Sequence, residues 1–154
     1  MSGPQTEGGP VKWWGWGFES KTYLLDDKPQ FWPYLLTTRY RIDDGPEQEQ
    51  ILNTFVVANG RFYAAGLKPA PNAQLDDGLF DIVSIGDVGF LEAASSLGKF
   101  RKGTHLQIPK VSLCRGRTVV ATSDETQLVE MEGEVVGRLP ARFEMLPKAM
   151  NIIV

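Results

Sequence analysis

Carboxylates gather at two places in this sequence, and each could support chemistry. The first is the stretch QLDDGLF, in which Asp76 and Asp77 precede Gly78. A turn of this kind can direct a carboxylate and nearby main-chain carbonyls at a hard cation. Asp-Gly is also a strong signal for a plain hairpin turn. Because one or two carboxylates are few for a tight calcium site, these residues alone favour the turn and leave the cation site open.

The second place is VEMEGEVVG, which contains Glu130, Glu132 and Glu134. In one unbroken strand these side chains would share a face at intervals of about 7 Å. A bend at Glu132 and Gly133 is the favoured interpretation, and it leaves Glu134 just past the turn. A carboxylate there can act as a general base if a hydroxyl comes within hydrogen-bonding distance. The alternative to a general base is a solvated acidic edge that prevents strand mispairing. Between these two roles, the residues alone favour the acidic edge.

Other catalytic arrangements find no support in the sequence. His105 is the only histidine, so a site with two histidines is excluded, and we expect His105 to be a core or capping residue. Neither a Gly-x-Ser-x-Gly elbow nor a glycine-rich phosphate-binding loop occurs. The single cysteine, Cys114, follows VSL in an expected strand, which predicts a buried and unreactive thiol.

Length and charge narrow the class of protein. A chain of 154 residues is one domain's worth and can bury an ordinary apolar core. The net charge of −3 gives no broad basic surface, so we expect no nucleic-acid partner. No apolar run approaches the roughly twenty residues of a membrane span, and no signal peptide is recognisable. We therefore expect a cytoplasmic protein and leave peripheral membrane contact open.

The elements that must position these residues are mostly short strands. Gly, Pro, Asp and Ser separate runs rich in β-branched and aromatic residues. We expect strands at residues 39–43, 50–60, 61–64, 79–85, 111–115, 118–122, 127–131, 142–146 and 150–154. One segment, DVGFLEAASSLGKFRKG, has helical spacing, with Asp87 as N-cap and basic residues before Gly103. The pattern predicts an all-β fold, a two-layer antiparallel β-sandwich with one amphipathic helix inserted.

The N-terminal region differs in composition. Residues 1–10 are rich in Gly, Pro and polar residues, which predicts a disordered tail or an expression remnant. We expect residues 11–36 to form a short irregular or helical segment, and this segment contains all four tryptophans, Trp13, Trp14, Trp16 and Trp32. These aromatic side chains could pack over the open end of a sheet or form a lipid-facing or partner-facing patch, and core packing is favoured.

Three stretches together resemble a known family. They are VVANGRFYAAGLKPAPNAQLDDGLFDIV, KFRKGTHLQIPKV and VEMEGEVVGRLPARFEMLPKAMNIIV. In order and spacing they resemble the C-terminal half of the diacylglycerol kinase and sphingosine kinase superfamily, in its compact bacterial form. The resemblance runs from Phe31 to Val154. One departure is Tyr63-Ala64-Ala65-Gly66, where the family usually has a run of glycines.

The resemblance implies specific roles for some residues. Glu134 matches the family's general base, and Glu132 replaces the aspartate that usually precedes it. A structural Mg²⁺ would be held by the side chain of Asp77 and the main-chain carbonyls of Gln74 and Leu79. In the complete enzyme, Mg²⁺ also accompanies ATP.

The resemblance also implies a division of labour. Residues 11–154 would be the substrate-side β-sandwich of an ATP-dependent lipid kinase that phosphorylates a lipid hydroxyl of the diacylglycerol or sphingoid base class. The sandwich would supply the general base and part of the lipid cleft, and its partner would be a separate N-terminal ATP-binding domain. We therefore expect this chain alone to be inactive. The alternative is a non-catalytic β-sandwich that binds lipid or a membrane surface through the tryptophans.

Overall fold

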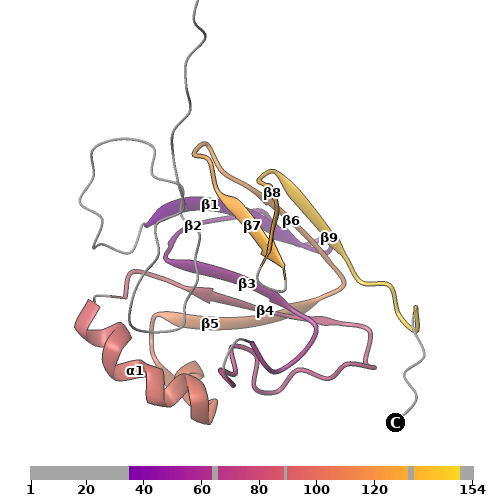
Figure 1. Cartoon of the computed structure of the whole chain (residues 1–154). Helices are drawn as coiled ribbons and strands as arrows, with labels where there is room; N and C mark the ends of the chain where they lie inside the picture. Colours follow the sequence, from indigo (N-terminus) through magenta and orange to yellow (C-terminus); the bar gives the residue numbers. More distant parts are fainter. Residues whose placement is uncertain (1–34, 64–65, 89, 132–133, 150–154) are drawn as a thin grey trace, which may run out of the picture.

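A computed structural model describes residues 35–63, 66–88, 90–131 and 134–149, and it contains two antiparallel sheets and a separate hairpin (Figure 1). One sheet has the strand order β2-β1-β6-β9 and the other the order β3-β4-β5, while β7 and β8 form the hairpin. The strands are β1 Leu36–Ile42, β2 Gln48–Leu52, β3 Thr54–Ala58, β4 Phe80–Ile85, β5 Val111–Gly116, β6 Thr118–Thr122, β7 Leu128–Met131, β8 Glu134–Arg138 and β9 Ala141–Glu144.

The two sheets pack face to face, and the C-terminal part of a helix packs through Phe100 against the outer face of the three-stranded sheet. Tyr40 of β1 contacts Phe55 of β3 with ring centroids 4.8 Å apart, so the two layers meet there. Strand β4 is central in its sheet, and its alternate residues point to opposite faces. Val83 and Ile85 face the side of α1 (Phe90–Lys102) and the short helix η1 (His105–Gln107), where the larger buried cluster lies. The predicted antiparallel β-sandwich with one helix is confirmed.

The chain passes between the two sheets within one residue at two places. The strand predicted over residues 50–60 is wrong, because β2 and β3 belong to different sheets and are separated by Asn53. The Asn53 N–H donates to the carbonyl of Ile85, 2.8 Å away, which fixes the break. In the same way, β5 and β6 are separated by Arg117 alone. No proline stands at either crossing. The sequence therefore contained no turn signal that would have separated β2 from β3.

Other strand predictions also differ from the structure, and β1 begins three residues earlier and ends one residue earlier than expected. The described part of the segment predicted as a strand at residues 61–64 forms only an isolated bridge between Tyr63 and Leu67. Strand β8 was not predicted, and β9 begins one residue earlier and ends two residues earlier than expected. The predicted strand at residues 150–154, the tail at residues 1–10 and the tryptophan cluster lie outside the described residues.

Cys114 is exposed, so the prediction of a buried thiol is wrong. It lies in β5, which is an edge strand of its sheet. An edge strand has a neighbour on one side only, so an apolar sequence pattern does not ensure that every side chain is covered.

Helix α1 ends in a Schellman motif. Gly103 has a φ of 76°, its N–H donates to the carbonyl of Phe100, and the N–H of Thr104 donates to the carbonyl of Lys99. These two bonds satisfy carbonyl groups that the end of a helix leaves unpaired. The start of the helix is two residues later than an N-cap at Asp87 would give. Within the described residues, neither helix has the length and apolar character needed to cross a bilayer.

His105 is a core residue, as predicted. Its side chain is fully buried, its ring stacks on Phe100 with centroids 4.0 Å apart, and its Nε2 donates to the carbonyl of Pro69 at 2.9 Å. Its Nδ1 has no hydrogen-bond partner among the described residues. Burial lowers the pKa of His105, and the bond to the Pro69 carbonyl opposes this only in part. The ring is therefore neutral in the folded protein at pH 7.

Acidification should destabilise the fold through His105. Because the folded-state pKa lies below the unfolded value, stability is complete above the unfolded pKa of about 6.5 and falls as the pH drops below it. The slope can reach about 1.4 kcal/mol per pH unit for this single group. Urea unfolding at pH values from 7.5 to 5 measures it. The His105→Phe variant, which keeps a ring next to Phe100, should have a flatter profile, and an unchanged profile would contradict the assignment.

Candidate functional site

The turn before β4 is built around Asp77. The Oδ1 of Asp77 accepts a hydrogen bond of 3.0 Å from the N–H of Leu79, and Gly78 between them has a φ of 73°. A residue with a side chain is strained at this φ, which explains the glycine. The turn is not the loop of a short β-hairpin. Strand β3 ends at Ala58 and β4 begins only at Phe80, so a long segment precedes the turn. The Asp-Gly signal therefore marks the entry to β4.

The carboxylate of Asp77 also pairs with an arginine from the neighbouring strand. Arg115 of β5 uses one terminal nitrogen for Asp77 Oδ2, and its Nε donates to Asp81 Oδ1 at 2.7 Å. Asp81 and Arg115 are directly opposite each other in the β4–β5 register. The Leu79 N–H and the Arg115 guanidinium together hold the pKa of the Asp77 carboxyl below its ordinary value. Asp77 therefore stays ionised at neutral pH.

Asp81 and Arg115 were not singled out from the sequence. Asp81 is only 1% exposed, and its Oδ2 has no partner among the described residues. The two carboxylates raise the pKa of Arg115, with Asp81 as the larger contributor. The sequence did contain a signal for this pair. Asp81 lies in one expected strand and Arg115 in the next, and opposite charges can pair across an antiparallel ladder.

The ligands predicted for a structural magnesium are Gln74, Asp77 and Leu79, and all three lie in this turn. Within the described residues, no three side chains of His, Cys, Asp or Glu gather as a metal site. A cation here would therefore depend on main-chain oxygens, and the carbonyls of Gln74 and Leu79 accept no hydrogen bond from the described part of the chain. A carboxylate and main-chain carbonyls are oxygen ligands of the kind that Mg²⁺ prefers. Asp77 is shared with Arg115.

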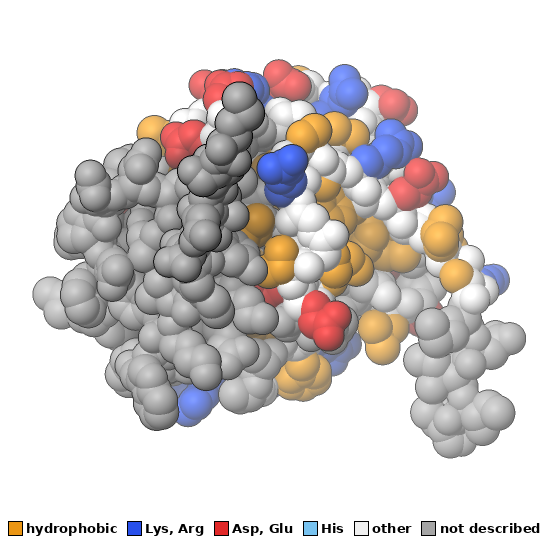
Figure 2. All heavy atoms as spheres, turned by 45° about the horizontal axis from the view of Figure 1, so that its top comes forward, with side chains coloured by type: hydrophobic (Ala, Val, Ile, Leu, Met, Phe, Trp, Pro, Cys, Tyr) orange, Lys and Arg blue, Asp and Glu red, His pale blue; other side chains and the backbone are white. Residues whose placement is uncertain are grey.

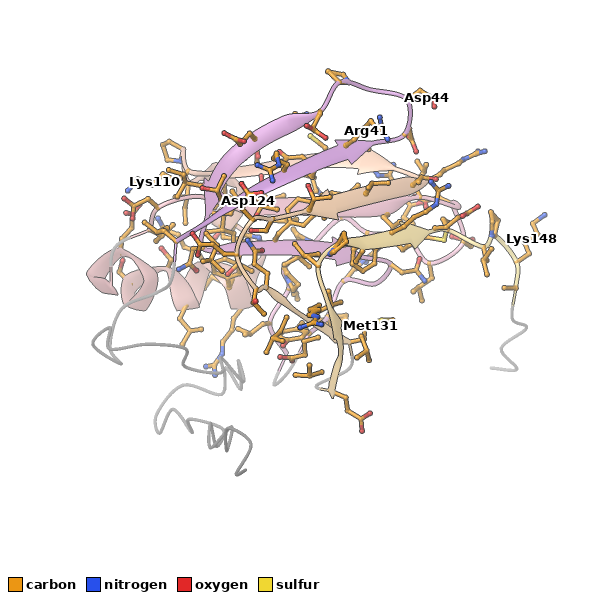
Figure 3. The ribbon with its side chains drawn as sticks, turned by 90° about the horizontal axis from the view of Figure 1, so that it is seen from above. Arg41, Asp44, Lys110, Asp124, Met131 and Lys148 are labelled. Atoms are coloured by element: carbon orange, nitrogen blue, oxygen red, sulfur yellow. The ribbon has the colours of Figure 1, made fainter. Side chains whose placement is uncertain are left out.

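Glu134, the predicted general base, lies in a different part of the molecule. It is the first residue of β8, is paired with Met131 of β7, and has an exposed side chain. Strand β7 ends at Met131 and β8 begins at Glu134, and residues 132 and 133, where the bend was predicted, lie outside the described residues. Figure 3 shows the hairpin that carries Met131 projecting from the sandwich. Among the described residues, no hydrogen bond or ion pair joins Glu134 to Asp77, whose carboxylate contacts Leu79 and Arg115.

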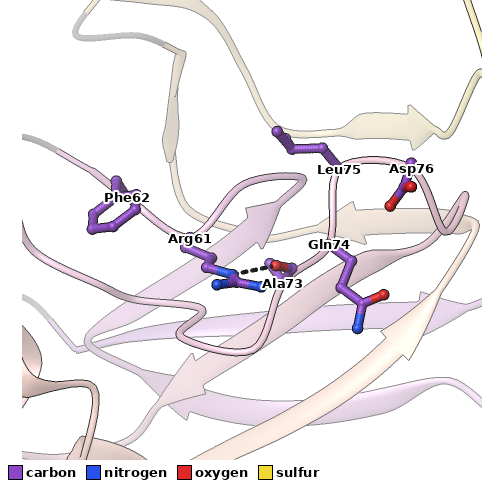
Figure 4. A pocket seen from close by; sticks show the side chains of 6 residues that line it. All are labelled: Arg61, Phe62, Ala73, Gln74, Leu75 and Asp76. Carbon is purple, nitrogen blue, oxygen red and sulfur yellow. Dashed lines mark hydrogen bonds between the residues drawn. The ribbon is translucent and has the colours of Figure 1, made fainter.

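A cavity of about 430 Å³ lies beside the Asp77 turn. Its lining comes from two segments, Arg61 and Phe62 on one side and residues 73–76 on the other (Figure 4). The Nε of Arg61 donates to the carbonyl of Ala73 at 2.8 Å and ties the two segments together. Phe62 and Leu75 are 67% and 69% exposed, respectively. Phe62 and Leu75 therefore add apolar surface to a lining that also contains the exposed Arg61, Gln74 and Asp76.

The cavity segment also contacts the hairpin. The hydroxyl of Tyr63 donates to Glu130 of β7 over 2.8 Å, so the residue next to Phe62 holds the strand that leads to the hairpin turn. Met131 and Val136 of the same hairpin are exposed. Figure 2 shows hydrophobic side chains gathered between charged ones on one face of the molecule. An apolar surface with isolated charges suits an amphipathic ligand or a partner domain.

Comparison with known proteins identifies the family. Residues 31–154 match the family described as the YegS C-terminal NAD kinase beta sandwich-like domain. The matched range includes both sheets, the Asp77 turn and the β7–β8 hairpin. The chain belongs to this family. As a YegS-type C-terminal domain, it also belongs to the diacylglycerol kinase group that the sequence motifs predicted.

Relatives of this YegS-type domain are diacylglycerol kinases. The diacylglycerol kinase of Staphylococcus carnosus (strain TM300) is 26% identical over 121 residues, which cover 78% of this chain and 40% of that protein. The diacylglycerol kinase of Mycobacterium tuberculosis (strain ATCC 25618 / H37Rv) is 27% identical over an alignment of 172 residues, which covers 97% of this chain and 54% of that protein. The chain therefore spans about half the length of these curated relatives, or less.

A solved structure agrees on the fold. The crystal structure of a diacylglycerol kinase from Bacillus anthracis str. Sterne superposes with a TM-score of 0.56 at 16% identity, over 75% of this chain and 41% of that chain. At this identity the likeness concerns the fold alone. It agrees with the two packed antiparallel sheets of the YegS-type domain.

Proposed function

We propose that this chain is the C-terminal, substrate-side domain of a lipid kinase that transfers the γ-phosphate of ATP to a lipid hydroxyl. The match of residues 31–154 to the YegS-type family carries the proposal. In the proposed assignment, residues 11–154 form the substrate-side domain, and the nucleotide-binding part is a separate N-terminal domain, as expected from relatives about twice as long as this chain or more. The lipid is a diacylglycerol or a sphingoid base.

In the proposed reaction, Glu134 takes the proton of the lipid hydroxyl while the hydroxyl oxygen attacks the γ-phosphorus and ADP leaves. The side chain of Glu134 is exposed at the start of β8 in the projecting β7–β8 hairpin, where a docking domain can cover it. General-base catalysis supplies part of the rate, and the groups that neutralise phosphate charge belong to the nucleotide-binding domain. The exposed Phe62 and Leu75 at the cavity mouth offer apolar contacts for the lipid.

The proposal is tested by joining this chain to a nucleotide-binding domain. We would fuse this chain to the portion of the M. tuberculosis diacylglycerol kinase that it does not cover and measure transfer of labelled phosphate from ATP to diacylglycerol and sphingosine in mixed micelles. The fusion should produce a phosphorylated lipid, and this chain alone should not. A folded fusion that binds ATP and yields no product, while the intact relative is active, would contradict the proposed function.

A second candidate is a module that binds a membrane surface without catalysis, in a cytoplasmic protein that attaches peripherally. The exposed side chains of Phe62 and Leu75, with the Lys68 ammonium 5.5 Å from the centre of the Phe62 ring, favour it. Flotation of this chain with phosphatidylglycerol liposomes separates the two functions. Strong binding by the chain alone supports the module, and absence of binding supports the dependent kinase domain.

We also propose that Mg²⁺ binds at the turn through the Asp77 carboxylate and the carbonyls of Gln74 and Leu79. The ion would brace the entry to β4 and take no part in phosphate transfer. Asp77→Ala should lower Tm and remove any dependence of Tm on Mg²⁺, because it removes the only side-chain ligand. Thermal unfolding in about 5 mM MgCl₂ and in EDTA measures both effects. This MgCl₂ concentration suits a weak site, with a dissociation constant on the order of 10⁻³ M. The same response to Mg²⁺ in the wild type and the variant would refute the site.

A further inference from the structure

We propose that the Arg115 guanidinium supplies the positive charge that stabilises the turn before β4. It holds the carboxylates of Asp77 and Asp81 in place, and it competes with a divalent cation for Asp77. The competition rests on the proposed magnesium site, whereas the role of Arg115 in holding the turn rests on contacts in the structure alone.

The geometry of Arg115 suits this role. Its Nε and one terminal nitrogen contact two different carboxylates, and the guanidinium is planar, so both contacts are made by one rigid group. Asp81 is opposite Arg115 in the ladder, which fixes the first contact by strand register. The second contact reaches back to the turn, four residues before Asp81. Arg115 therefore links the turn to β5 as well as to β4.

The charges do not balance around this arginine. Two carboxylates share one guanidinium, which leaves one negative charge, and Asp81 Oδ2 is buried with no partner in the described part of the chain. A buried carboxylate that loses its counter-ion is strongly destabilising. Removing Arg115 should therefore leave Asp81 with an uncompensated buried charge. A divalent cation bound at Asp77, which shares Arg115 with Asp81, would then supply positive charge close to Asp81.

The contact between Arg115 and Asp77 should weaken the binding of Mg²⁺ at the turn. A guanidinium in contact with Asp77 repels a cation that approaches the same carboxylate, and at these separations the repulsion is large enough to change affinity about tenfold or more. Arg115 therefore sets the Mg²⁺ affinity of the turn. Because Arg115 already contacts Asp77, a weak response of Tm to Mg²⁺ is expected in the wild type.

The experiment compares the wild type with Arg115→Gln, by thermal unfolding in EDTA and across a series of MgCl₂ concentrations at constant ionic strength. In EDTA, Arg115→Gln should lower Tm by on the order of 10 °C. Mg²⁺ should restore most of that loss, with half of the effect at a concentration about tenfold lower than in the wild type. Arg142→Gln is the matched control, since Arg142 pairs with the exposed Glu144, and it should change neither quantity.

A double variant keeps the test decisive if Arg115→Gln does not fold. Asp81→Asn with Arg115→Gln removes the buried charge along with its partner, and it should recover much of the Tm in EDTA. An unchanged Tm for Arg115→Gln in EDTA, or no recovery in the double variant, would overturn the role in holding the turn. Equal Mg²⁺ responses in Arg115→Gln and the wild type would overturn the competition. If neither responds to Mg²⁺, the magnesium site fails as well, while lipid phosphorylation by the fusion protein tests the kinase function independently.

Discussion

Glu134→Gln should lower the rate of lipid phosphorylation by the two-domain fusion by roughly 10²-fold to 10⁴-fold, the share that a positioned general base usually supplies. The amide has nearly the same shape as the carboxylate but cannot accept the proton of the hydroxyl. Because the Glu134 side chain is exposed, Tm should be unchanged. The measurement is kcat and KM for diacylglycerol at saturating ATP, and the loss should be in kcat.

The matched control for that variant is Glu144→Gln. Glu144 is also an exposed glutamate on a strand, but it lies in β9 and pairs with Arg142. It should leave kcat unchanged. Normal activity in Glu134→Gln, or an equal loss in both variants, would show that Glu134 is not the base.

Gly116→Ala should lower the free energy of unfolding by about 1–3 kcal/mol, the usual cost of overpacking a core. A Cβ on this buried residue would lie 2.3 Å from Ile42 Cγ2 and 3.0 Å from Asp43 Oδ2. Asp43 cannot move away freely, because its Oδ1 accepts the N–H groups of Arg117 and Thr118 at 2.9 and 2.8 Å. Urea unfolding should show a lower midpoint with an unchanged slope.

Gly98→Ala makes the same chemical change where there is room. Gly98 is an exposed residue of α1, and no atom of a neighbouring segment lies within 4 Å of the place that an alanine methyl group would take. In a helix, alanine is favoured over glycine by about 1 kcal/mol, so this variant should be more stable than the wild type. A loss of stability of similar size in both variants would contradict the packing argument for Gly116.

The fold class could be predicted because its signals are local. Runs of β-branched and aromatic residues marked most strands, and the helical spacing with terminal basic residues marked α1. Gly103 marked the end of that helix because only a residue that tolerates positive φ suits a Schellman motif. The break at Asn53 had no such marker. It depends on a bond to the Ile85 carbonyl, which exists only after β4 has been placed.

The candidate site was predictable in part, for the same reason. The motifs singled out Asp77, which lies within a recognisable Asp-Gly turn, and Glu134, which follows Glu132 and Gly133 in the sequence. They did not show that Asp77 would pair with Arg115, since that contact joins residues 38 positions apart. Exposure of Cys114 was also missed, because it depends on the position of β5 at the edge of its sheet. Long-range pairing and layer position are properties of the assembled sheets.

The single-residue crossings at Asn53 and Arg117 have a consequence for how this protein loses its structure. Each crossing leaves no slack between a strand of one layer and a strand of the other. Neither layer can separate from its neighbour without straining the backbone at both crossings. The sandwich should therefore melt cooperatively as one unit, and a partly opened form that keeps one layer intact should be rare.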